Sequence, residues 1–299
     1  MAGFTAVPRG VRIRKARACG TLLNGDGRMG FRRTRFEESW LDYDGMRLRV
    51  VDTGRGEPIL FPHGLGGKIE DNDLIFPFLA DRYRVISVDQ PGSGLSDKPV
   101  DIDYTVEWLA DFLLDFASRL GLESFHLIGG SQGGLLTLLC CEKAPERVRR
   151  AVVYSPSGVW DANPALAGVV KRLPPHAVRA FMRFTSLFWN SPARPDYWSG
   201  RAQALEFVDE ASQEPGFGRH VFGCVASVFS EDFRPRFARI TTPLLILWGE
   251  HDFGMPVSQG RELHGLIPHA QFETIPEAGH NVLSERPRLC AAKIKKFLG

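Results

Sequence analysis

The sequence predicts an α/β protein with a mostly parallel central sheet. Short apolar runs that end in glycine or proline turns recur along the chain, at residues 58–64, 83–94, 125–130, 150–158, 243–252 and, more weakly, 270–276. Continuous apolar runs of this length are typical of strands buried on both faces. Helical patterns alternate with these runs, at residues 105–122, 133–144 and 285–298. Such alternation favours parallel strands with helices packed on the sheet.

The regular pattern begins near residue 39. Residues 39–54 contain two short alternating runs around Asp44-Gly45, a residue pair that favours a β-hairpin turn. The chain has 299 residues, of which 43 % are hydrophobic, so it can bury a large core without disulfide bonds. Its five cysteines show no C-x-x-C spacing, which indicates reduced thiols and a cytoplasmic location.

One segment interrupts the alternation of strands and helices. Residues 157–237 are rich in aromatic residues, contain helical fragments separated by prolines, and show no clear strand pattern. We therefore expect a helical cap to be inserted between two strands of the sheet. The predicted organisation is an N-terminal extension (1–35), a core in two parts (36–156 and 238–299), and the insertion (157–237).

The N-terminal extension is strongly basic. Residues 1–35 hold nine basic residues and one acidic residue, a net charge of about +8, which leaves about −6 for residues 36–299 because the whole chain carries +2. The mildly acidic body gives no reason to expect nucleic-acid binding. Its arginine-rich, acid-poor composition is typical of a targeting segment, but it lacks the apolar run of a secretory signal. We expect a disordered extension instead. No apolar stretch in the sequence approaches the roughly 20 residues that span a bilayer.

The stretch GGSQGG, residues 129–134, predicts a reactive serine. It lies between an apolar strand and an apolar helix, where the chain has almost no room to turn. Gly129 and Gly133 stand two residues before and after Ser131, in the G-x-S-x-G pattern of a nucleophile elbow. The serine would sit at the N-terminus of a helix, whose backbone N–H groups favour a developing negative charge.

Two other interpretations of these glycines were weighed. A phosphate-binding loop needs the pattern G-x-x-x-x-G-K-[ST] or G-x-G-x-x-G, and residues 129–134 fit neither. A tight turn with an idle serine is the simpler alternative. Residues further along the chain decide between this alternative and a nucleophile.

A serine hydroxyl needs a contacting base, and that base needs an orienting acid. In this class of motif the chain order is serine, acid, histidine. Asp252 ends a predicted strand at a turn, and His280 follows the next predicted strand. Both should lie at the carboxyl edge of the sheet with Ser131, where ligand sites of open α/β sheets are found. Glu250 and Asp161 are the alternative acids.

The remaining histidines are weaker candidates because of their predicted positions within a strand, within helices or in the insertion. They are His126, His176, His220, His251, His264 and His269.

An oxyanion hole needs backbone N–H donors near the serine. The residue after the nucleophile, Gln132, should supply one of them. The loop FPHGLGG at residues 61–67 should supply the second through Leu65, which follows the turn at Gly64. The alternative interpretation of this loop is an ordinary glycine turn.

The motifs HGLGG, SVDQPGSGLSD, GGSQGG, WGEHD and AGH occur in an order and spacing that resemble the α/β-hydrolase fold family, in its capped serine hydrolase branch. The resemblance covers roughly residues 39–299. It implies a Ser131–Asp252–His280 triad, no metal or organic cofactor, and a small acyl substrate under a helical cap. Branches of the family that use aspartate as the nucleophile do not match Ser131.

Several activities remain open within this resemblance. An esterase acting on a small, mainly apolar substrate is expected first, and a carbon–carbon bond hydrolase or a proline iminopeptidase-like aminopeptidase is the alternative. An aminopeptidase would need a carboxylate in the cap for the substrate amine, and the available residues are Glu206, Asp209, Glu210 and Glu214. A non-catalytic ligand receptor on the same fold is a fourth hypothesis. The sequence does not indicate an oligomeric state.

Overall fold

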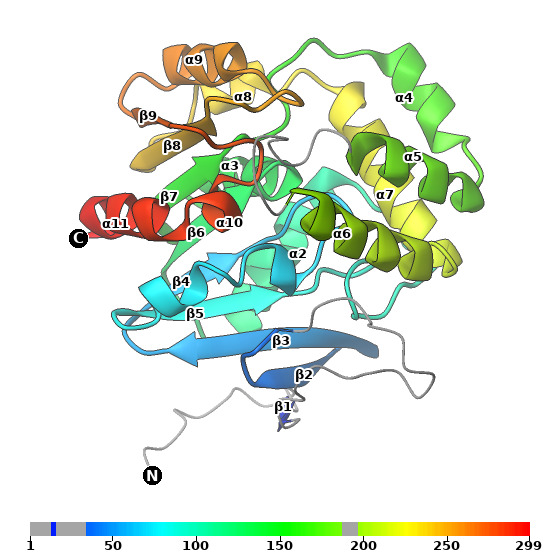
Figure 1. Ribbon diagram of the computed structural model, residues 1–299, viewed down its shortest axis with the longest axis horizontal. Coiled ribbons are helices and arrows are strands. Elements are labelled where there is room, and N and C mark those ends of the chain that lie inside the picture. The colour runs from blue at the N-terminus through cyan, green and yellow to red at the C-terminus, as the bar shows by residue number, and fades with distance from the viewer. Residues whose placement is uncertain (1–12, 16–33, 187–196) are drawn as a thin grey trace.

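The computed structural model describes residues 13–15, 34–186 and 197–299. Their strands form one nine-stranded sheet in the order β1-β2-β3-β5-β4-β6-β7-β8-β9 (Figure 1). The strands are β1 (Ile13–Lys15), β2 (Glu38–Tyr43), β3 (Met46–Gly54), β4 (Glu57–Phe61), β5 (Tyr83–Val88), β6 (Phe125–Gly130), β7 (Val148–Tyr154), β8 (Leu244–Gly249) and β9 (Gln271–Ile275). The predicted α/β class is confirmed.

The six strands from β5 to β9 along the sheet pair in parallel, whereas β1, β2 and β3 pair antiparallel. The turn between β2 and β3 has the predicted residues, Asp44 and Gly45, and both have positive φ angles (52° and 85°). Such angles suit the tight turn of a two-residue hairpin. The parallel strands bring the loops after β4, β5, β6, β8 and β9 to one edge of the sheet.

Helices cover both faces of the sheet. They are α1 (Phe76–Leu79), α2 (Val106–Arg119), α3 (Gln132–Lys143), α8 (Arg234–Phe237), α9 (Val257–Leu266), α10 (Val282–Glu285) and α11 (Pro287–Leu298), with a 3-10 turn, η1 (Ile69–Asp71). One apolar core joins α2, α3, α8 and α9 to the sheet, and a second core joins α1, α10 and α11 to it. Burial on both faces explains why the parallel strands are almost wholly apolar.

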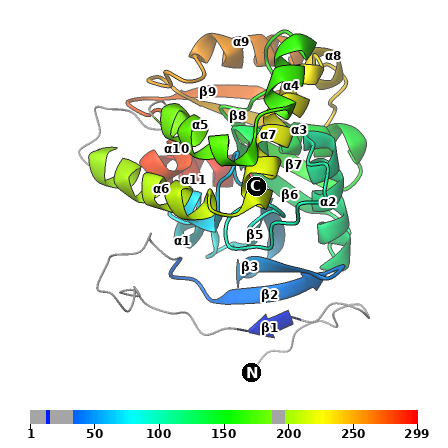
Figure 2. The same cartoon turned by 90° about the vertical axis from the view of Figure 1, so that its right-hand side faces the viewer.

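Residues 157–237, which we call the helical insertion, leave the sheet after β7 and return before β8. Its first helices are α4 (Pro164–Lys171), η2 (Pro175–Ala177), α5 (Val178–Thr185), α6 (Tyr197–Ala211) and α7 (Pro215–Ser230). Helices α4, α5, α6 and α7 share an apolar cluster of their own. They gather beside the sheet in Figure 1 and face the viewer in Figure 2.

Helix α7 rests on the loops that follow β4 and β5. A Cβ atom at Gly66 would lie 3.1 Å from Phe217 and 3.2 Å from Val221, and one at Gly92 would lie 2.7 Å from His220. The helical insertion is therefore packed against the edge of the sheet where the predicted catalytic residues lie.

The basic N-terminal extension is described only in part. Ile13–Lys15 form β1 and pair with β2, a short strand that the sequence analysis did not expect. Residues 1–12 and 16–33 lie outside the described residues, so the expectation of disorder there stays a prediction. Among the helices that the structure describes, none is long and apolar enough to cross a membrane.

A buried arginine joins the antiparallel and parallel parts of the sheet. Arg49 on β3 is fully buried and forms ion pairs with Glu38 on β2 at 2.9 Å, with Asp89 after β5 at 3.0 Å, and with Glu70 in η1. Asp89 also accepts hydrogen bonds from the backbone N–H groups of Ile69 (2.8 Å) and Leu95 (2.7 Å). The arrangement fixes the loops after β4 and β5 relative to each other.

Replacing Arg49 with Met should destabilise the fold by about 3–5 kcal/mol, because it leaves buried carboxylates without their counter-charge. The matched control is Arg84→Met. Arg84 pairs with Asp52 near the surface, where 32 % and 29 % of the two side chains are exposed. An exposed pair contributes less than about 1 kcal/mol. Urea unfolding of both variants measures the difference, and similar losses would contradict the role given to Arg49.

The stability lost in the Arg49→Met variant should depend on pH. Burial alone would raise the pKa of Glu70, but the hydrogen bond and charge of Arg49 outweigh it and hold that pKa below its usual value. A carboxyl whose pKa is lowered on folding stabilises the native state above its unfolded pKa, about 4.3, and loses this contribution as the pH falls further. The stability gap between the unmodified chain and Arg49→Met should therefore be full at pH 7 and narrow below about pH 4.

Candidate active site

Ser131 lies at the turn between β6 and α3 in a strained backbone conformation, with φ 53° and ψ −125°. The two flanking glycines are required by space. A Cβ at Gly129 would lie 2.2 Å from the carbonyl oxygen of Gly133, and a Cβ at Gly133 would lie 2.4 Å from that of Pro62. Positive φ at a non-glycine residue costs free energy, so it persists only where the surroundings impose it. The Ser131 N–H donates to Tyr154 O at 3.1 Å, which helps to hold the turn.

The predicted oxyanion donors flank Ser131. Gln132 is the first residue of α3, so its backbone N–H has no acceptor within the helix. The loop after β4 comes close on another side, since a Cβ at Gly64 would lie 3.5 Å from the Cβ of Ser131. Leu65 follows Gly64 directly. The structure thus brings both predicted donor segments to the serine.

His63, which was predicted only to help turn the chain before Leu65, fixes this loop by hydrogen bonds. The Gln90 backbone N–H donates to His63 Nε2 at 3.0 Å, so that nitrogen carries no proton. The proton must then be on Nδ1, which donates to Gly64 O at 2.8 Å. The Gln90 side-chain amide also donates to His63 O at 3.0 Å. These bonds anchor the loop after β4 to the loop after β5.

Asp252 and His280 are in direct contact, although 28 positions separate them in the chain. His280 Nδ1 lies 2.8 Å from Asp252 Oδ2, and the side chain of Asp252 is fully buried. The other carboxylate oxygen of Asp252 accepts the backbone N–H groups of Gly254 (3.1 Å) and Met255 (2.8 Å). Because a carboxylate only accepts, Nδ1 carries a proton, and in the neutral imidazole Nε2 then has the free lone pair.

Hydrogen bonds to the neighbouring segments fix the loop that carries His280. The Gly279 N–H donates to Glu285 Oε2 at 2.9 Å, and the His251 N–H donates to Ala278 O at 2.8 Å. Glu285 is buried at the end of α10, and the sequence analysis missed it. No sequence pattern marks Glu285, because its role depends on a side-chain contact with the backbone of Gly279.

The alternative residues are engaged elsewhere. Asp161 forms an ion pair with Arg234, and Glu250 accepts from the Thr274 hydroxyl at 3.2 Å. His126 contacts Glu57 at 2.9 Å, near the opposite edge of the sheet. Burial, together with the nearby His63, lowers the pKa of His220 to about 3. His220 is therefore neutral at ordinary pH.

Buried side-chain polar atoms surround the serine without a hydrogen-bond partner among the described residues. They include Ser155 Oγ and Ser157 Oγ. Ser157 lies close to the nucleophile, since its N–H donates to Ser131 O at 3.0 Å. Buried polar atoms in native proteins are normally paired, so these two hydroxyls are available to a ligand.

The cysteines offer no competing nucleophile in the part of the chain that the structure describes. Cys140, Cys141, Cys224 and Cys290 are free and buried. Burial raises the pKa of each thiol, which disfavours the reactive thiolate. Within the same described ranges, no group of three or more His, Cys, Asp or Glu side chains could hold a metal ion.

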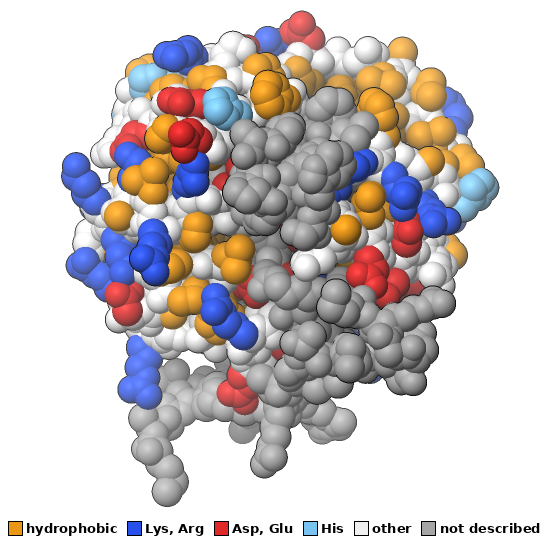
Figure 3. Space-filling view, in the orientation of Figure 1, with side chains coloured by type: hydrophobic (Ala, Val, Ile, Leu, Met, Phe, Trp, Pro, Cys, Tyr) orange, Lys and Arg blue, Asp and Glu red, His pale blue; other side chains and the backbone are white. Residues whose placement is uncertain are grey.

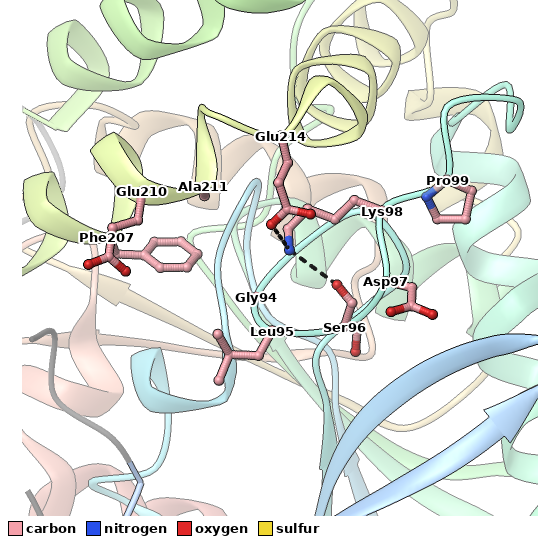
Figure 4. Close-up of a pocket in the computed structure, with 10 residues that line it drawn as sticks. All are labelled: Gly94, Leu95, Ser96, Asp97, Lys98, Pro99, Phe207, Glu210, Ala211 and Glu214. Atoms are coloured by element: carbon pink, nitrogen blue, oxygen red, sulfur yellow. Dashed lines mark hydrogen bonds and ion pairs between the residues drawn. The ribbon is translucent and has the colours of Figure 1, made fainter. Parts of the chain in front are cut away.

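A pocket of about 450 Å³ lies between α6 and the loop 94–99 (Figure 4). Lys98 points across it to Glu214 at 2.9 Å. Glu214 is one of the acids considered as a holder of a substrate amine, and Asp209 is another. Asp209 is bonded to Arg179 and Arg183. Two of the four candidate carboxylates are therefore neutralised by basic residues of the protein itself.

Comparisons with known proteins agree with the fold described above. The family profile described as the alpha/beta hydrolase fold matches residues 57–287. The chain is 27 % identical to cis-3-alkyl-4-alkyloxetan-2-one decarboxylase of Shewanella oneidensis, over 88 % of each chain. It is 27 % identical to 2-hydroxy-6-oxo-6-phenylhexa-2,4-dienoate hydrolase of Burkholderia cepacia, over 78 % of this chain and 85 % of that protein.

Among solved structures, the enol-lactonase of Burkholderia xenovorans superposes with a TM-score of 0.73 at 22 % identity. That match covers 87 % of this chain and 99 % of the enol-lactonase, and it shows the fold. The family profile spans most of the chain and includes Ser131, Asp252 and His280. The chain therefore belongs to the α/β-hydrolase fold family.

Proposed function

We propose that this protein is a serine hydrolase that cleaves an acyl bond through Ser131, His280 and Asp252. The observation that carries the proposal is the buried Asp252–His280 pair, bonded at 2.8 Å, at the same sheet edge as the strained Ser131. A bonded acid and base at the same sheet edge as a serine in an elbow are the groups that activate a weak hydroxyl nucleophile once the base contacts it.

In the proposed mechanism, Ser131 Oγ attacks the substrate carbonyl carbon while His280 Nε2 takes the hydroxyl proton. The backbone N–H groups of Leu65 and Gln132 hold the negative oxygen of the tetrahedral intermediate. His280 then gives its proton to the leaving group, and an acyl-enzyme remains. Water, deprotonated by His280, attacks that acyl group and releases the acid and free Ser131.

Asp252 has a positioning role in this scheme. Its carboxylate keeps the proton of the neutral imidazole on Nδ1 and stabilises the imidazolium that forms during each step. The backbone N–H groups of Gly254 and Met255 hold the other oxygen and fix the carboxylate plane. No step requires a metal or an organic cofactor.

An ester or lactone of a small, mainly apolar acid is the substrate class we propose. One relative is named as a decarboxylase of an oxetan-2-one, and one solved structure with this fold is named an enol-lactonase; both names give a cyclic ester as the substrate. We propose that the helical insertion forms a cap over the site, since α7 packs on the loops after β4 and β5. The four described cysteines are free, which supports the expected cytoplasmic location.

A carbon–carbon bond hydrolase is the second candidate, because the relative from Burkholderia cepacia carries that kind of name. The aminopeptidase alternative has less support, since Asp209 and Glu214 are bonded to basic side chains. A non-catalytic receptor is the least supported, because the Asp252–His280 bond would then have no purpose beyond packing.

Replacing Ser131 with Ala should abolish labelling by a fluorophosphonate probe and lower kcat by about 10⁶-fold, since the nucleophile is lost. Hydrolysis of p-nitrophenyl esters measures the rate, and mass spectrometry locates the label. The control is Ser118→Ala, which removes an exposed hydroxyl far from the elbow. Ester turnover that survives in Ser131→Ala would rule out the proposed nucleophile.

Replacing Asp252 with Asn should lower kcat by about 10⁴-fold, because an amide can donate to Nδ1 and so favours the wrong imidazole tautomer. The control, Asp161→Asn, alters an exposed carboxylate paired with Arg234 and should change the rate little. Stopped-flow and steady-state rates on one ester test both variants. An equal effect of the two substitutions would show that Asp161 has an equivalent role.

A substrate panel separates the proposed ester hydrolase from its alternatives. We expect kcat/KM for p-nitrophenyl esters or lactones to exceed that for vinylogous diketones and amino-acyl amides. The hydroxyls of Ser155 and Ser157 near Ser131 have no hydrogen-bond partner among the described residues, and they are uncharged groups that suit an ester better than an ammonium group. Faster cleavage of the diketones would assign the chain to carbon–carbon bond hydrolysis instead.

A further inference from the structure

Large hydrophobic side chains gather on the outside of the helical insertion. Seven such side chains are strongly exposed among the described residues, and four of them lie within 19 positions. These four are Leu166 (39 % exposed), Val169 (58 %), Leu173 (37 %) and Phe184 (63 %). We call residues 162–186, which include α4 and α5, the cap hairpin.

The packing of the cap hairpin explains which side chains face outward. In α4, Ala167 and Val170 are buried, and α4 packs along α7. Leu166 and Val169 lie three residues apart in α4, so they share a face of that helix next to the buried one, and Leu173 follows just after the helix ends. Phe184, on α5, is likewise turned away from the buried Met182. Exposed apolar side chains that cluster in this way mark an interaction surface, whereas single ones do not.

The charge of the cap hairpin is one-sided. It contains four Lys or Arg residues (Lys171, Arg172, Arg179 and Arg183) and no Asp or Glu. Two acidic residues of neighbouring segments face it, because Asp103 pairs with Lys171 and Asp209 pairs with Arg179 and Arg183. Their two charges leave a net charge of about +2. Figure 3 shows hydrophobic and basic side chains side by side over α4 and α5.

We propose that the cap hairpin docks on the surface of an anionic phospholipid bilayer. Its exposed apolar side chains would enter the boundary between headgroups and acyl chains, and its basic side chains would contact lipid phosphates. A helix can lie on a bilayer in this manner without the length and apolarity needed to span it. The proposal does not depend on the proposed hydrolase activity, because the cap hairpin contains none of the proposed catalytic residues.

Charge favours a lipid surface over a second copy of the chain. With its two acidic neighbours each cap hairpin carries a net charge of about +2, so two of them brought face to face would repel each other. An anionic bilayer instead attracts each basic residue within a Debye length of its surface.

The test is co-sedimentation of the full chain with vesicles, either of phosphatidylcholine alone or of phosphatidylcholine mixed with phosphatidylglycerol. We expect binding to the mixed vesicles at low salt, weaker binding as salt rises, and little binding to phosphatidylcholine alone. The double variant Lys171→Gln/Arg172→Gln should bind roughly 10- to 30-fold more weakly, given the attraction of each basic residue to an anionic surface. The double variant Val169→Ser/Phe184→Ser should lose the binding that persists at high salt.

A matched control carries equivalent substitutions elsewhere. The double variant Leu289→Ser/Lys296→Gln changes one exposed apolar and one exposed basic residue of α11 and should bind as the unmodified chain does. Residues 1–35 stay unchanged throughout, so their positive charge is constant. Thermal unfolding confirms that each variant is folded before its binding is compared.

Two results would overturn the proposal. The first is unchanged vesicle binding in both cap-hairpin variants, which would assign any attraction to the basic residues 1–35. The second is a dimer, seen by analytical ultracentrifugation, that Val169→Ser/Phe184→Ser converts to a monomer. That outcome would mean that a second copy of the chain covers this surface.

Discussion

The geometry of the candidate site depends on one steric constraint, the turn at Ser131. A strand enters this turn and a helix leaves it with no space for a Cβ at Gly129 or Gly133. The crowding forces Ser131 into a positive φ angle and places it ahead of the first free N–H of α3. Strain of this kind is stable only because the surrounding sheet and helix are fully packed. The large apolar core therefore supports the position of one side chain.

Buried polar contacts also fix the loops at the same edge of the sheet. Arg49, Asp89, Gln90 and His63 connect the loops after β4 and β5 through ion pairs and hydrogen bonds, in a region with little access to water. Buried polar groups of this kind are costly if one partner is lost, so they specify a single arrangement. The loop that presents Leu65 has the fixed shape that a preorganised donor needs.

Local pattern predicted much of this molecule from its sequence. The strands, the elbow at Ser131 and the positions of Asp252 and His280 depend on apolar runs and turn residues that are close together in the chain. The contacts of Arg49, the tautomer of His63 and the support of Gly279 by Glu285 could not be predicted in this way. Each of these contacts depends on side-chain geometry, which leaves no periodic pattern in the sequence. Strand β1 is too short for such a pattern to be recognised.

The helical insertion departs from β7 and rejoins the chain at β8, which is the neighbouring strand in the sheet. Its end points are thus fixed by a pair of strands that are already held together, and it has an apolar cluster of its own. Changes in its length or composition need not disturb the strands that carry Ser131 and Asp252. The surface of the helical insertion can therefore diverge during evolution while the strands around Ser131 and Asp252 keep their arrangement.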